Sequence, residues 1–398
     1  MRALDDIRVL DLTHVFNGPY AAQVLALLGA EVIKIEPRPY GERARSIFPI
    51  PDTEKQSYPF VMLNSNKKGI TLNLKTARGK ALFKQFVTHA DIVVENFTAG
   101  TMDKLGLGYQ DLKRVNPRII YASSSGYGKT GPYSAYPAFD SIVQALSGIM
   151  STTGDPAGPP MKAGPPIMDI MAGIHFAAGI LAALHQRDRT GEGLEVETSL
   201  FESAIGPLTA QISAYRAQGG SYERAGNRAP NRAFSPYNCY PASDGYVLLL
   251  TSDNQRWQAL CQLMGREDIA QDENFATNRA RSKHADEVDE IVSAWTIRHP
   301  KHEIMRLCGE ADITCGAVQT VEEVLNDPHL RERGILKDID HPTAGPVTVL
   351  GAPWRFNDQQ PPNDTPSPNL GEHNELVYSK LLGLSEAEIR TLKEDEVI

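Results

Sequence analysis

The sequence predicts an α/β fold built on a doubly wound parallel sheet. In the first half of the chain, short stretches rich in Ile and Val alternate with segments of helical periodicity. Alternation of this kind gives parallel strands in one sheet with helices on both faces. The 398 residues, 41% of them hydrophobic and 22% charged, are enough for two or three domains with substantial cores.

The first half is expected to alternate strand and helix along the chain. The expected strands are residues 7–12, 32–35, 69–74, 92–94 and 119–122. The expected helices are residues 20–28, 77–89 and about 103–115. A helix over 170–184, a strand over 194–198 and a helix over 201–217 follow. Because the carboxyl ends of parallel strands share one edge of a sheet, the polar stretches after them are candidates for one cleft. These stretches are residues 13–17, 36–38, 73–75 and 96–97.

The second half predicts a smaller domain with its own strands and helices. Residues 226–241, rich in Asn, Arg and Pro, resemble a linker. We then expect strands over 246–251 and 316–318, and helices over 255–264, 285–297, 301–310 and 320–326. The tail from His329 is Pro-rich and ends in a helix over 386–394. The expected division is a large domain over 1–200, a linker over 201–225 and a small domain over 226–330.

Charge and composition exclude several classes of function. The net charge is −9, the pI is near 5.6, and no long basic block occurs, which argues against nucleic acid or an anionic membrane as a partner. The first residues do not resemble a signal peptide, and no uninterrupted apolar run is long enough to span a bilayer. We therefore expect a cytoplasmic protein. The four cysteines are widely spaced without a C-x-x-C pair, and no metal site is expected.

One glycine motif is misleading. Residues 126–131, GYGKTG, match G-x-G-x-x-G after an expected strand. A dinucleotide site also needs a helix opening at the glycines and an acid about twenty residues later. Pro132 and Pro137 interrupt any helix that would start at the glycines, and the required acid is missing. A glycine-rich turn is therefore the preferred interpretation. Walker A, H-E-x-x-H and G-x-S-x-G motifs do not occur.

Asp169 is the principal candidate for a catalytic residue. It follows AGPPIM and precedes a small, apolar stretch with no other acid, residues 170–184. The positive end of a helix dipole favours an anion at that point. The structural alternative is a helix N-cap, for which Asp is among the preferred residues. Local sequence alone favours neither.

Six segments spread along the chain carry a resemblance to a known family. They are VLDLTHVFNGPYAAQVLALLGAEVIKIEP, LNSNKKGITLNLKT, DIVVENFTAGTMDKLGLGY, NPRIIYASSSGYGKTGP, GILAALHQRDRTGEG and LGEHNELV. In this order they resemble the family III CoA-transferases, the group of formyl-CoA transferase and the CaiB/BaiF proteins. The resemblance implies a Rossmann-like large domain completed by residues 335–398, a smaller α+β domain, and an interlocked homodimer.

The resemblance also implies a mechanism with Asp169 as nucleophile. Its carboxylate would attack the donor thioester to give a mixed anhydride, and the released CoA thiolate would convert this into an aspartyl-CoA thioester. An acceptor carboxylate would then reverse the steps. CoA thioesters would be substrates, and no tightly bound cofactor is implied. Backbone N–H groups would have to stabilise the oxyanion.

The resemblance assigns a set of CoA contacts. The matching positions are Phe16, Asn17, Arg38, Leu72, Asn73, Lys75, Asn96, Phe97, Lys104 and Asp140. Phe97 offers a face for the adenine, and Lys75 a charge for a phosphate. Lys104 could equally be a solvated helix lysine, and capping of the following helix is the preferred role for Asp140.

Several positions depart from the formyl-CoA transferase pattern. Phe16 and Asn17 replace a Gln-Ser type of pair, and Pro37 stands where those enzymes have an arginine, with Arg38 displaced by one. Pro137 replaces a lysine. These differences argue against formate as the preferred substrate. Segments 13–19 and 121–126 look closest to acetyl-CoA:oxalate transferases, and succinyl-CoA-dependent dicarboxylate transferases share much of the framework. A small carboxylic or dicarboxylic acid is therefore the expected acceptor.

Two alternatives have to be weighed. A 2-methylacyl-CoA racemase would carry Gly-His-Asp where this chain reads Ala138-Phe139-Asp140, so one of two required bases is missing. His14 could face substrate, whereas His175 reads as a core residue. A non-catalytic CoA-binding subunit would lack the nucleophile, which Asp169 argues against. Arg45, Arg228 and Arg232 are candidate carboxylate ligands, although each reads better as a surface arginine.

Overall fold

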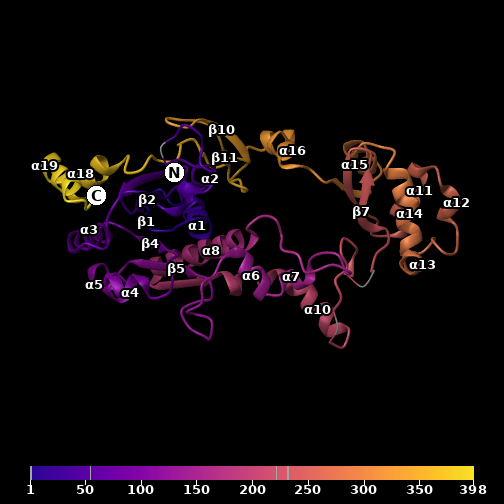
Figure 1. Cartoon of the computed structure of the whole chain (residues 1–398), viewed down its shortest axis with the longest axis horizontal. Coiled ribbons are helices and arrows are strands. Elements are labelled where there is room, and N and C mark those ends of the chain that lie inside the picture. Colours follow the sequence, from indigo (N-terminus) through magenta and orange to yellow (C-terminus); the bar gives the residue numbers. More distant parts are fainter. Residues whose placement is uncertain (1, 54, 221, 231–232) are drawn as a thin grey trace. The chain divides into compact units, whose positions relative to one another are not determined.

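The computed structural model describes residues 2–53, 55–220, 222–230 and 233–398 (Figure 1). Two compact units make up the chain. The large unit contains Met1–Ser147, Gly164–Pro207 and Asp327–Ile398, and the small unit contains Gly148–Ala163 and Leu208–Asn326. The chain thus leaves the large unit at Gly148, well before the expected boundary near residue 200, and returns for Gly164–Pro207.

A six-stranded parallel sheet forms the centre of the large unit. Its strands are β1 (Arg8–Asp11), β2 (Glu31–Glu36), β3 (Lys67–Thr71), β4 (Ile92–Glu95), β5 (Ile120–Ser125) and β6 (Glu195–Ser199). Their order is β3-β2-β1-β4-β5-β6, and all of the pairings are parallel. This is the doubly wound order of Rossmann folds, in which the direction of winding reverses between β1 and β4. The predicted fold class of the large domain is confirmed.

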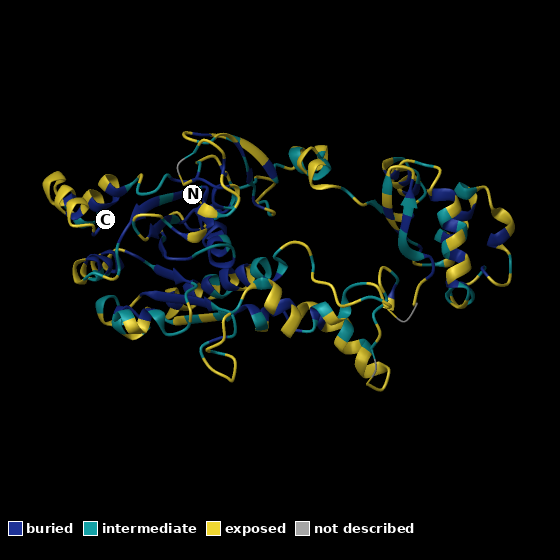
Figure 2. Ribbon diagram, in the orientation of Figure 1, coloured by how far each residue is buried: buried dark blue, intermediate teal, exposed yellow. Residues whose placement is uncertain are grey.

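Helices cover both faces of this sheet. The helices of the large unit before residue 207 are α1 (Asn17–Leu27), α2 (Tyr58–Asn64), α3 (Ala77–Thr88), α4 (Thr101–Leu105), α5 (Tyr109–Val115), α6 (Asp140–Leu146), α8 (Ile167–Thr190) and α9 (Leu200–Ser203), with the 3-10 turn η1 (Arg43–Ser46). Val9 packs with α1 and α8, whereas Leu10 packs with α3 and α5 on the other face. Successive strand residues alternate between two cores because side chains of a strand point to opposite faces. Figure 2 shows the central strands β1, β2 and β4 as mainly buried.

The C-terminal segment adds to the large unit. Its elements are α17 (Pro328–Glu332), β10 (Leu336–His341), β11 (Gly345–Leu350), α18 (Asn374–Leu382) and α19 (Glu386–Glu394). Val377 and Leu392 enter the core on the α3 face. The Tyr378 hydroxyl donates to the Thr71 carbonyl oxygen at 2.8 Å, and the Asn374 amide exchanges two hydrogen bonds with Thr71. The tail is therefore fixed at the carboxyl end of β3.

The small unit is an α+β assembly. It contains α7 (Ile149–Thr152), α10 (Thr209–Ala217), β7 (Tyr237–Ala242), β8 (Gly245–Leu250), α11 (Asn254–Met264), α12 (Glu267–Ala270), α13 (Asn278–Lys283), α14 (Ala285–Thr296), α15 (Lys301–Glu310), β9 (Thr314–Ala317) and α16 (Val321–Leu325). The three strands form an antiparallel sheet in the order β7-β8-β9. Trp257, Val288 and Ile304 bring α11, α14 and α15 into one core with it.

Two expected helices are interrupted where the sequence contains helix breakers. In place of one helix over 201–217, the chain forms α9, the 3-10 turn η2 (Gly206–Leu208) and α10. Pro207 breaks the helix because it lacks an N–H donor and clashes with the preceding turn. The expected helix over 103–115 is α4 and α5, separated at Gly106, whose φ of 71° ends α4. β7 begins at Tyr237, inside the segment of residues 226–241 whose composition resembles a linker.

Helix α8 is long and apolar enough, by length and composition alone, to cross a membrane, with a mean hydropathy of 1.9. The sequence showed no uninterrupted apolar run of that length because His175 divides the stretch. In the structure 44% of that stretch is buried, and the helix packs against α1, β5 and β6. A helix that packs one face on the core of its own unit passes the same test, and α8 is such a helix.

Candidate active site

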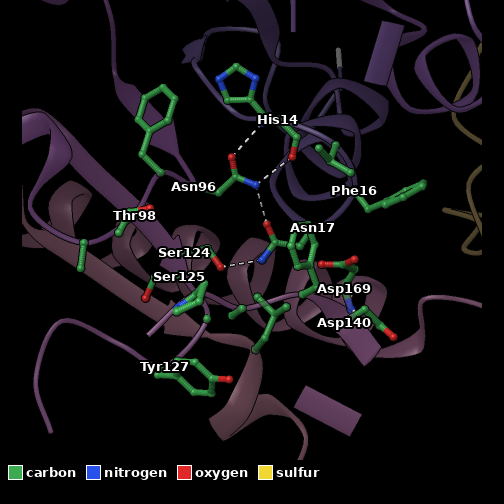
Figure 3. Close-up of a pocket in the computed structure, with 18 of the residues that line it drawn as sticks. His14, Phe16, Asn17, Asn96, Thr98, Ser124, Ser125, Tyr127, Asp140 and Asp169 are labelled. Carbon is green, nitrogen blue, oxygen red and sulfur yellow. Dashed lines mark hydrogen bonds between the residues drawn. The ribbon is translucent and has the colours of Figure 1, made fainter. Parts of the chain in front are cut away.

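A cleft of about 430 Å³ lies at the carboxyl ends of β1, β4 and β5 (Figure 3). The reversal of strand order between β1 and β4 falls here, which is where open parallel sheets bind their ligands. The lining residues are His14, Val15, Phe16, Asn17, Arg43, Asn96, Phe97, Thr98, Ala99, Ser124, Ser125, Gly126, Tyr127, Ser134, Tyr136, Pro137, Ala138, Phe139, Asp140, Asp169 and Leu200.

Asn96 joins the loops that follow β1 and β4. Its Oδ1 accepts the His14 N–H at 2.7 Å, and its Nδ2 donates to the His14 carbonyl oxygen and to Asn17 Oδ1, each at 2.9 Å. Asn17 Nδ2 in turn donates to Ser124 Oγ at 2.7 Å, which reaches the end of β5 (Figure 3). Three strand ends are thereby held together, and the Asn17 amide is occupied in doing so.

Val15 has a backbone conformation that β-branched residues rarely adopt, with a φ of 69°. The buried carboxylate of Glu42 holds it there, since Glu42 Oε2 accepts the Val15 N–H at 2.9 Å and the Ala44 N–H at 3.0 Å. Lys34 Nζ lies 3.6 Å from Glu42 Oε1 and donates to the Thr13 carbonyl oxygen. The loop wall of the cleft is therefore supported from beneath.

A second buried ion pair continues this network. Lys67 Nζ donates to Asp11 Oδ2 at 2.9 Å, and Asp11 Oδ1 accepts from the Thr13 N–H at 2.9 Å. Burial alone would raise the pKa of Asp11, but the ammonium groups of Lys34 and Lys67 hold it below its usual value. Burial lowers the pKa of Lys67 to about 8. Breaking one partner of such a pair leaves an uncompensated buried charge.

Asp169 is the third residue of α8 and lines the cleft. Burial, followed by the charge of Asp140, raises its pKa from 3.8 to about 7. The N–H groups of Met168 and Asp169 donate to Asp140 Oδ2 at 2.6 and 3.1 Å. The α8 N-terminus is therefore capped by Asp140 rather than by Asp169. This leaves the Asp169 carboxylate poorly solvated and directed to the cleft, as a nucleophile requires.

Asp140 differs from the expected role in one respect. It is the first residue of α6, its own helix, but the N–H groups it accepts belong to α8. Its Oδ1 accepts from Gln144 Nε2 at 2.5 Å. The expectation that it caps the following helix α6 was wrong, because its carboxylate accepts hydrogen bonds from the first turn of α8 instead.

A glycine sets the distance between α8 and α1. A Cβ at Gly173 would lie 2.7 Å from the Asn17 carbonyl oxygen and 3.1 Å from the Tyr20 ring. Gly173 follows Asp169 by four residues and so lies on the same helix face. The close approach of the two helices lets Asp169 of α8 and Asn17 of α1 line the same cleft (Figure 3).

His14 lies in the cleft as a neutral side chain. Burial, with the nearby Lys34 charge, lowers its pKa to about 4. Its ring packs against Phe97 at a centroid distance of 5.1 Å. Beneath Phe97, the buried Glu95 accepts the Phe97 N–H at 2.8 Å and the Tyr121 hydroxyl at 3.0 Å. Burial raises the pKa of Glu95 to about 7.

The structure brings six of the eleven expected site residues into this cleft: Phe16, Asn17, Asn96, Phe97, Asp140 and Asp169. Four others lie at the ends of β2 and β3: Arg38, Leu72, Asn73 and Lys75. Arg38 lines a separate cavity of about 390 Å³ beside Thr71, Lys393 and Ile398. Lys75 is exposed, whereas the Leu72 side chain is 2% exposed and belongs to the core.

The remaining candidates lie elsewhere. Lys104 is exposed in the last turn of α4. Arg45 is neither a surface residue nor free, because its Nε and Nη2 donate to the two Glu36 carboxylate oxygens, each at 2.7 Å, and its guanidinium packs on Phe60. Arg228 is bound by Asp286 and Asp289 in the small unit. Arg232 lies outside the described residues. His175 is exposed on α8, so its interpretation as a core residue was wrong.

Sequence reasoning missed several cleft residues. Ser124 and Arg43 line it, and Glu42 supports its loop. Ser124 is the penultimate residue of β5, so the strand-end rule that identified Asn96 could have identified it. Arg43 and Glu42 lie between β2 and α2, where no sequence pattern predicted structure. Among the described residues, no group of three or more His, Cys, Asp or Glu side chains could hold a metal ion.

Comparisons with known proteins agree on one family. Residues 4–374 match the family described as CoA-transferase family III. A formyl-CoA:oxalate CoA-transferase from Streptomyces coelicolor is 37% identical, over 100% of this chain and 99% of its own length. A succinyl-CoA–D-citramalate CoA-transferase from Chloroflexus aurantiacus is 36% identical, over 100% of this chain and 98% of its own length. The crystal structure of a CaiB/BaiF family protein from Brucella suis superposes with a TM-score of 0.87 at 34% identity, over 96% of this chain and 99% of that one.

Proposed function

This chain belongs to CoA-transferase family III, and we propose that it moves CoA from an acyl-CoA to a small mono- or dicarboxylic acid with Asp169 as the nucleophile. The observation that carries the assignment of Asp169 is its position. It is a poorly solvated carboxylate in the ligand cleft of a doubly wound sheet, with no cation bound to it among the described residues.

The reaction proceeds in four steps. The Asp169 carboxylate attacks the donor thioester carbonyl, the C–S bond breaks, and a mixed anhydride and CoA thiolate result. The thiolate attacks the aspartyl carbonyl, which releases the donor carboxylate and leaves an aspartyl-CoA thioester. The acceptor carboxylate attacks this thioester and expels the thiolate again. The thiolate then attacks the acceptor's carbonyl, which yields the new acyl-CoA and restores Asp169.

The pKa of Asp169 suits this cycle. With a pKa of about 7, a substantial fraction of the enzyme carries the ionised nucleophile at neutral pH. Its charge is not diminished by the helix N–H groups, which Asp140 occupies. Desolvation raises the energy of the carboxylate before attack, while the anhydride and thioester that it forms are uncharged at that position.

CoA can extend along the carboxyl edge of the sheet. We propose that its thioester lies in the cleft at β1 and β4, and its nucleotide near Arg38, Leu72, Asn73 and Lys75. The ends of β1 and β3 are separated by one strand, so the two places are about 10 Å apart at normal strand spacing. Phe97 lies in the cleft itself, whereas Lys104 follows β4, on the side of the cleft away from β3. An extended CoA molecule spans such a distance.

We further propose an interlocked homodimer, as the resemblance implies, and a cytoplasmic location, as the sequence analysis indicates. The exposed face of α8 supports a partner, because Ile174, Ala178 and Ala182 are exposed at helical spacing. Light scattering coupled to gel filtration would give the mass of two chains. The mass of one chain would contradict the dimer without affecting the proposed chemistry.

Variants of two aspartates on α8 test the role of Asp169. Asp169→Asn keeps the shape and removes the nucleophile, so turnover should fall below about one hundredth of the wild-type rate. Asp188→Asn, on the exposed part of the same helix, should change turnover less than about twofold. Turnover of Asp169→Asn above that limit would exclude covalent catalysis by Asp169.

The acceptor is proposed from the relatives and tested by a panel. The relatives from Streptomyces and Chloroflexus are named for oxalate and D-citramalate, both small dicarboxylates. One acyl-CoA donor offered with short mono- and dicarboxylates should identify a preferred acceptor through formation of its CoA thioester. Formation of none of them would contradict the proposed substrate class.

A further inference from the structure

Arg43 is the only side chain with a permanent positive charge among the described residues that line the cleft. It is exposed in the 3-10 turn η1. Within residues 2–53, 55–220, 222–230 and 233–398, no hydrogen bond, ion pair or ring contact involves its guanidinium group. An arginine that lines a ligand cleft without a protein partner has all five donors available to a ligand.

The backbone beneath Arg43 is rigidly held. The Glu42 N–H donates to Glu36 Oε2 at 3.0 Å, and the Glu42 carboxylate accepts from Val15 and Ala44. The next arginine in the turn, Arg45, is 3% exposed and bound to Glu36. The two arginines therefore differ in role: Arg45 fixes the turn, and Arg43 extends from a fixed turn to the cleft.

The other charges of the cleft make a cation necessary for an anionic acceptor. Asp140 and Asp169 are acidic, and His14 stays uncharged near pH 7 because its pKa is about 4. A dicarboxylate that enters with two negative charges is repelled by both aspartates. An arginine offsets this repulsion and binds a carboxylate through two parallel hydrogen bonds.

We propose that Arg43 binds the distal carboxylate of a dicarboxylic acid while the proximal carboxylate reacts at Asp169. This inference rests on the proposed function and makes it narrower. Arg43 would be a specificity-determining residue, which selects acids that carry a second carboxylate. An acid that ends in a methyl group instead would leave the guanidinium without its ligand.

The test compares two acceptors of equal chain length, succinate and butyrate, at a saturating concentration of acyl-CoA. Arg43→Gln should lower kcat/KM for succinate by at least about tenfold, the usual effect of losing a hydrogen bond to a charged group. It should lower kcat/KM for butyrate by less than about threefold. Arg43→Lys keeps the charge but not the two-pronged geometry, and should lie between wild type and Arg43→Gln for succinate.

Arg114→Gln is the matched control. Arg114 is an exposed arginine in the last turn of α5 and does not line the cleft, so its replacement should leave kcat/KM unchanged for both acceptors. An equal loss for succinate and butyrate with a raised KM for acyl-CoA would show that Arg43 binds CoA instead, and no loss for either would remove it from the site. Both results overturn this inference while the proposed function stands. Failure of the wild type to form any acyl-CoA product would overturn both.

Discussion

Asp169→Asn should stabilise the fold while it abolishes activity. The folded-state pKa of Asp169, about 7, exceeds the ordinary value of 3.8. Between these two pH values the folded protein holds a proton that the unfolded chain has released, so stability decreases as pH rises and the loss is complete above about pH 7. At about 1.4 kcal/mol per pKa unit, the ionised carboxylate costs up to about 4 kcal/mol at pH 8 and about 1.5 kcal/mol at pH 5.

Asparagine has nearly the same shape and no charge, so it escapes this cost. The stability advantage of Asp169→Asn over wild type should therefore grow by about 2.5 kcal/mol between pH 5 and pH 8, as measured by urea denaturation at both pH values. The exposed Asp188→Asn should show no such dependence. A pH-independent advantage, or a variant less stable than wild type at pH 8, would refute the assignment of a desolvated, ionised Asp169.

Three further predictions concern the cleft and its surroundings. Lys75→Ala should raise the KM for acyl-CoA far more than it lowers kcat, because a contact to a remote phosphate acts equally in ground and transition states; an unchanged KM would remove Lys75 from the site. Gly173→Ala should lower kcat by about tenfold or more, since its Cβ would push α8 away from Asn17. Gly164→Ala, where a Cβ meets nothing within 4 Å, should keep its activity. Equal activity of the two variants would contradict a role of Gly173 in positioning Asp169. With Phe139 in place of a base, the enzyme should not incorporate deuterium from heavy water into a 2-methylacyl-CoA, and incorporation without CoA transfer would favour a racemase. Phe139→His alone should also fail to racemise this substrate, because two opposed bases are needed.

The parallel sheet was predictable because its strands are short apolar runs with clear boundaries. Residues 92–94 and 119–122 are buried on both faces, so their sequence is hydrophobic throughout and the pattern is unambiguous. β10 and β11 were missed because they lie in a Pro-rich tail and form a hairpin against α2. Their stability comes from long-range packing, which local sequence does not reveal.

The site could be predicted only in part. Strand-end position identified Asn96 and Phe97, local sequence made Asp169 a candidate, and the family resemblance supplied the role of Asp169 and the position of Asp140. Neither could reveal that the Asp140 carboxylate accepts the α8 N–H groups, because residues 140 and 168 are far apart in sequence. Arg43 and Arg45 look equivalent in sequence, and only the contacts of Arg45 with Glu36 distinguish them.

The central claim is that CoA becomes covalently attached to Asp169. The enzyme incubated with an acyl-CoA, quenched in acid and digested, should yield a peptide containing Asp169 with the added mass of CoA less one water. Hydroxylamine should release that mass and leave an aspartyl hydroxamate at the same residue, and Asp169→Asn should give no adduct. CoA attached to a different residue, or turnover without any adduct trapped at Asp169, would contradict the account.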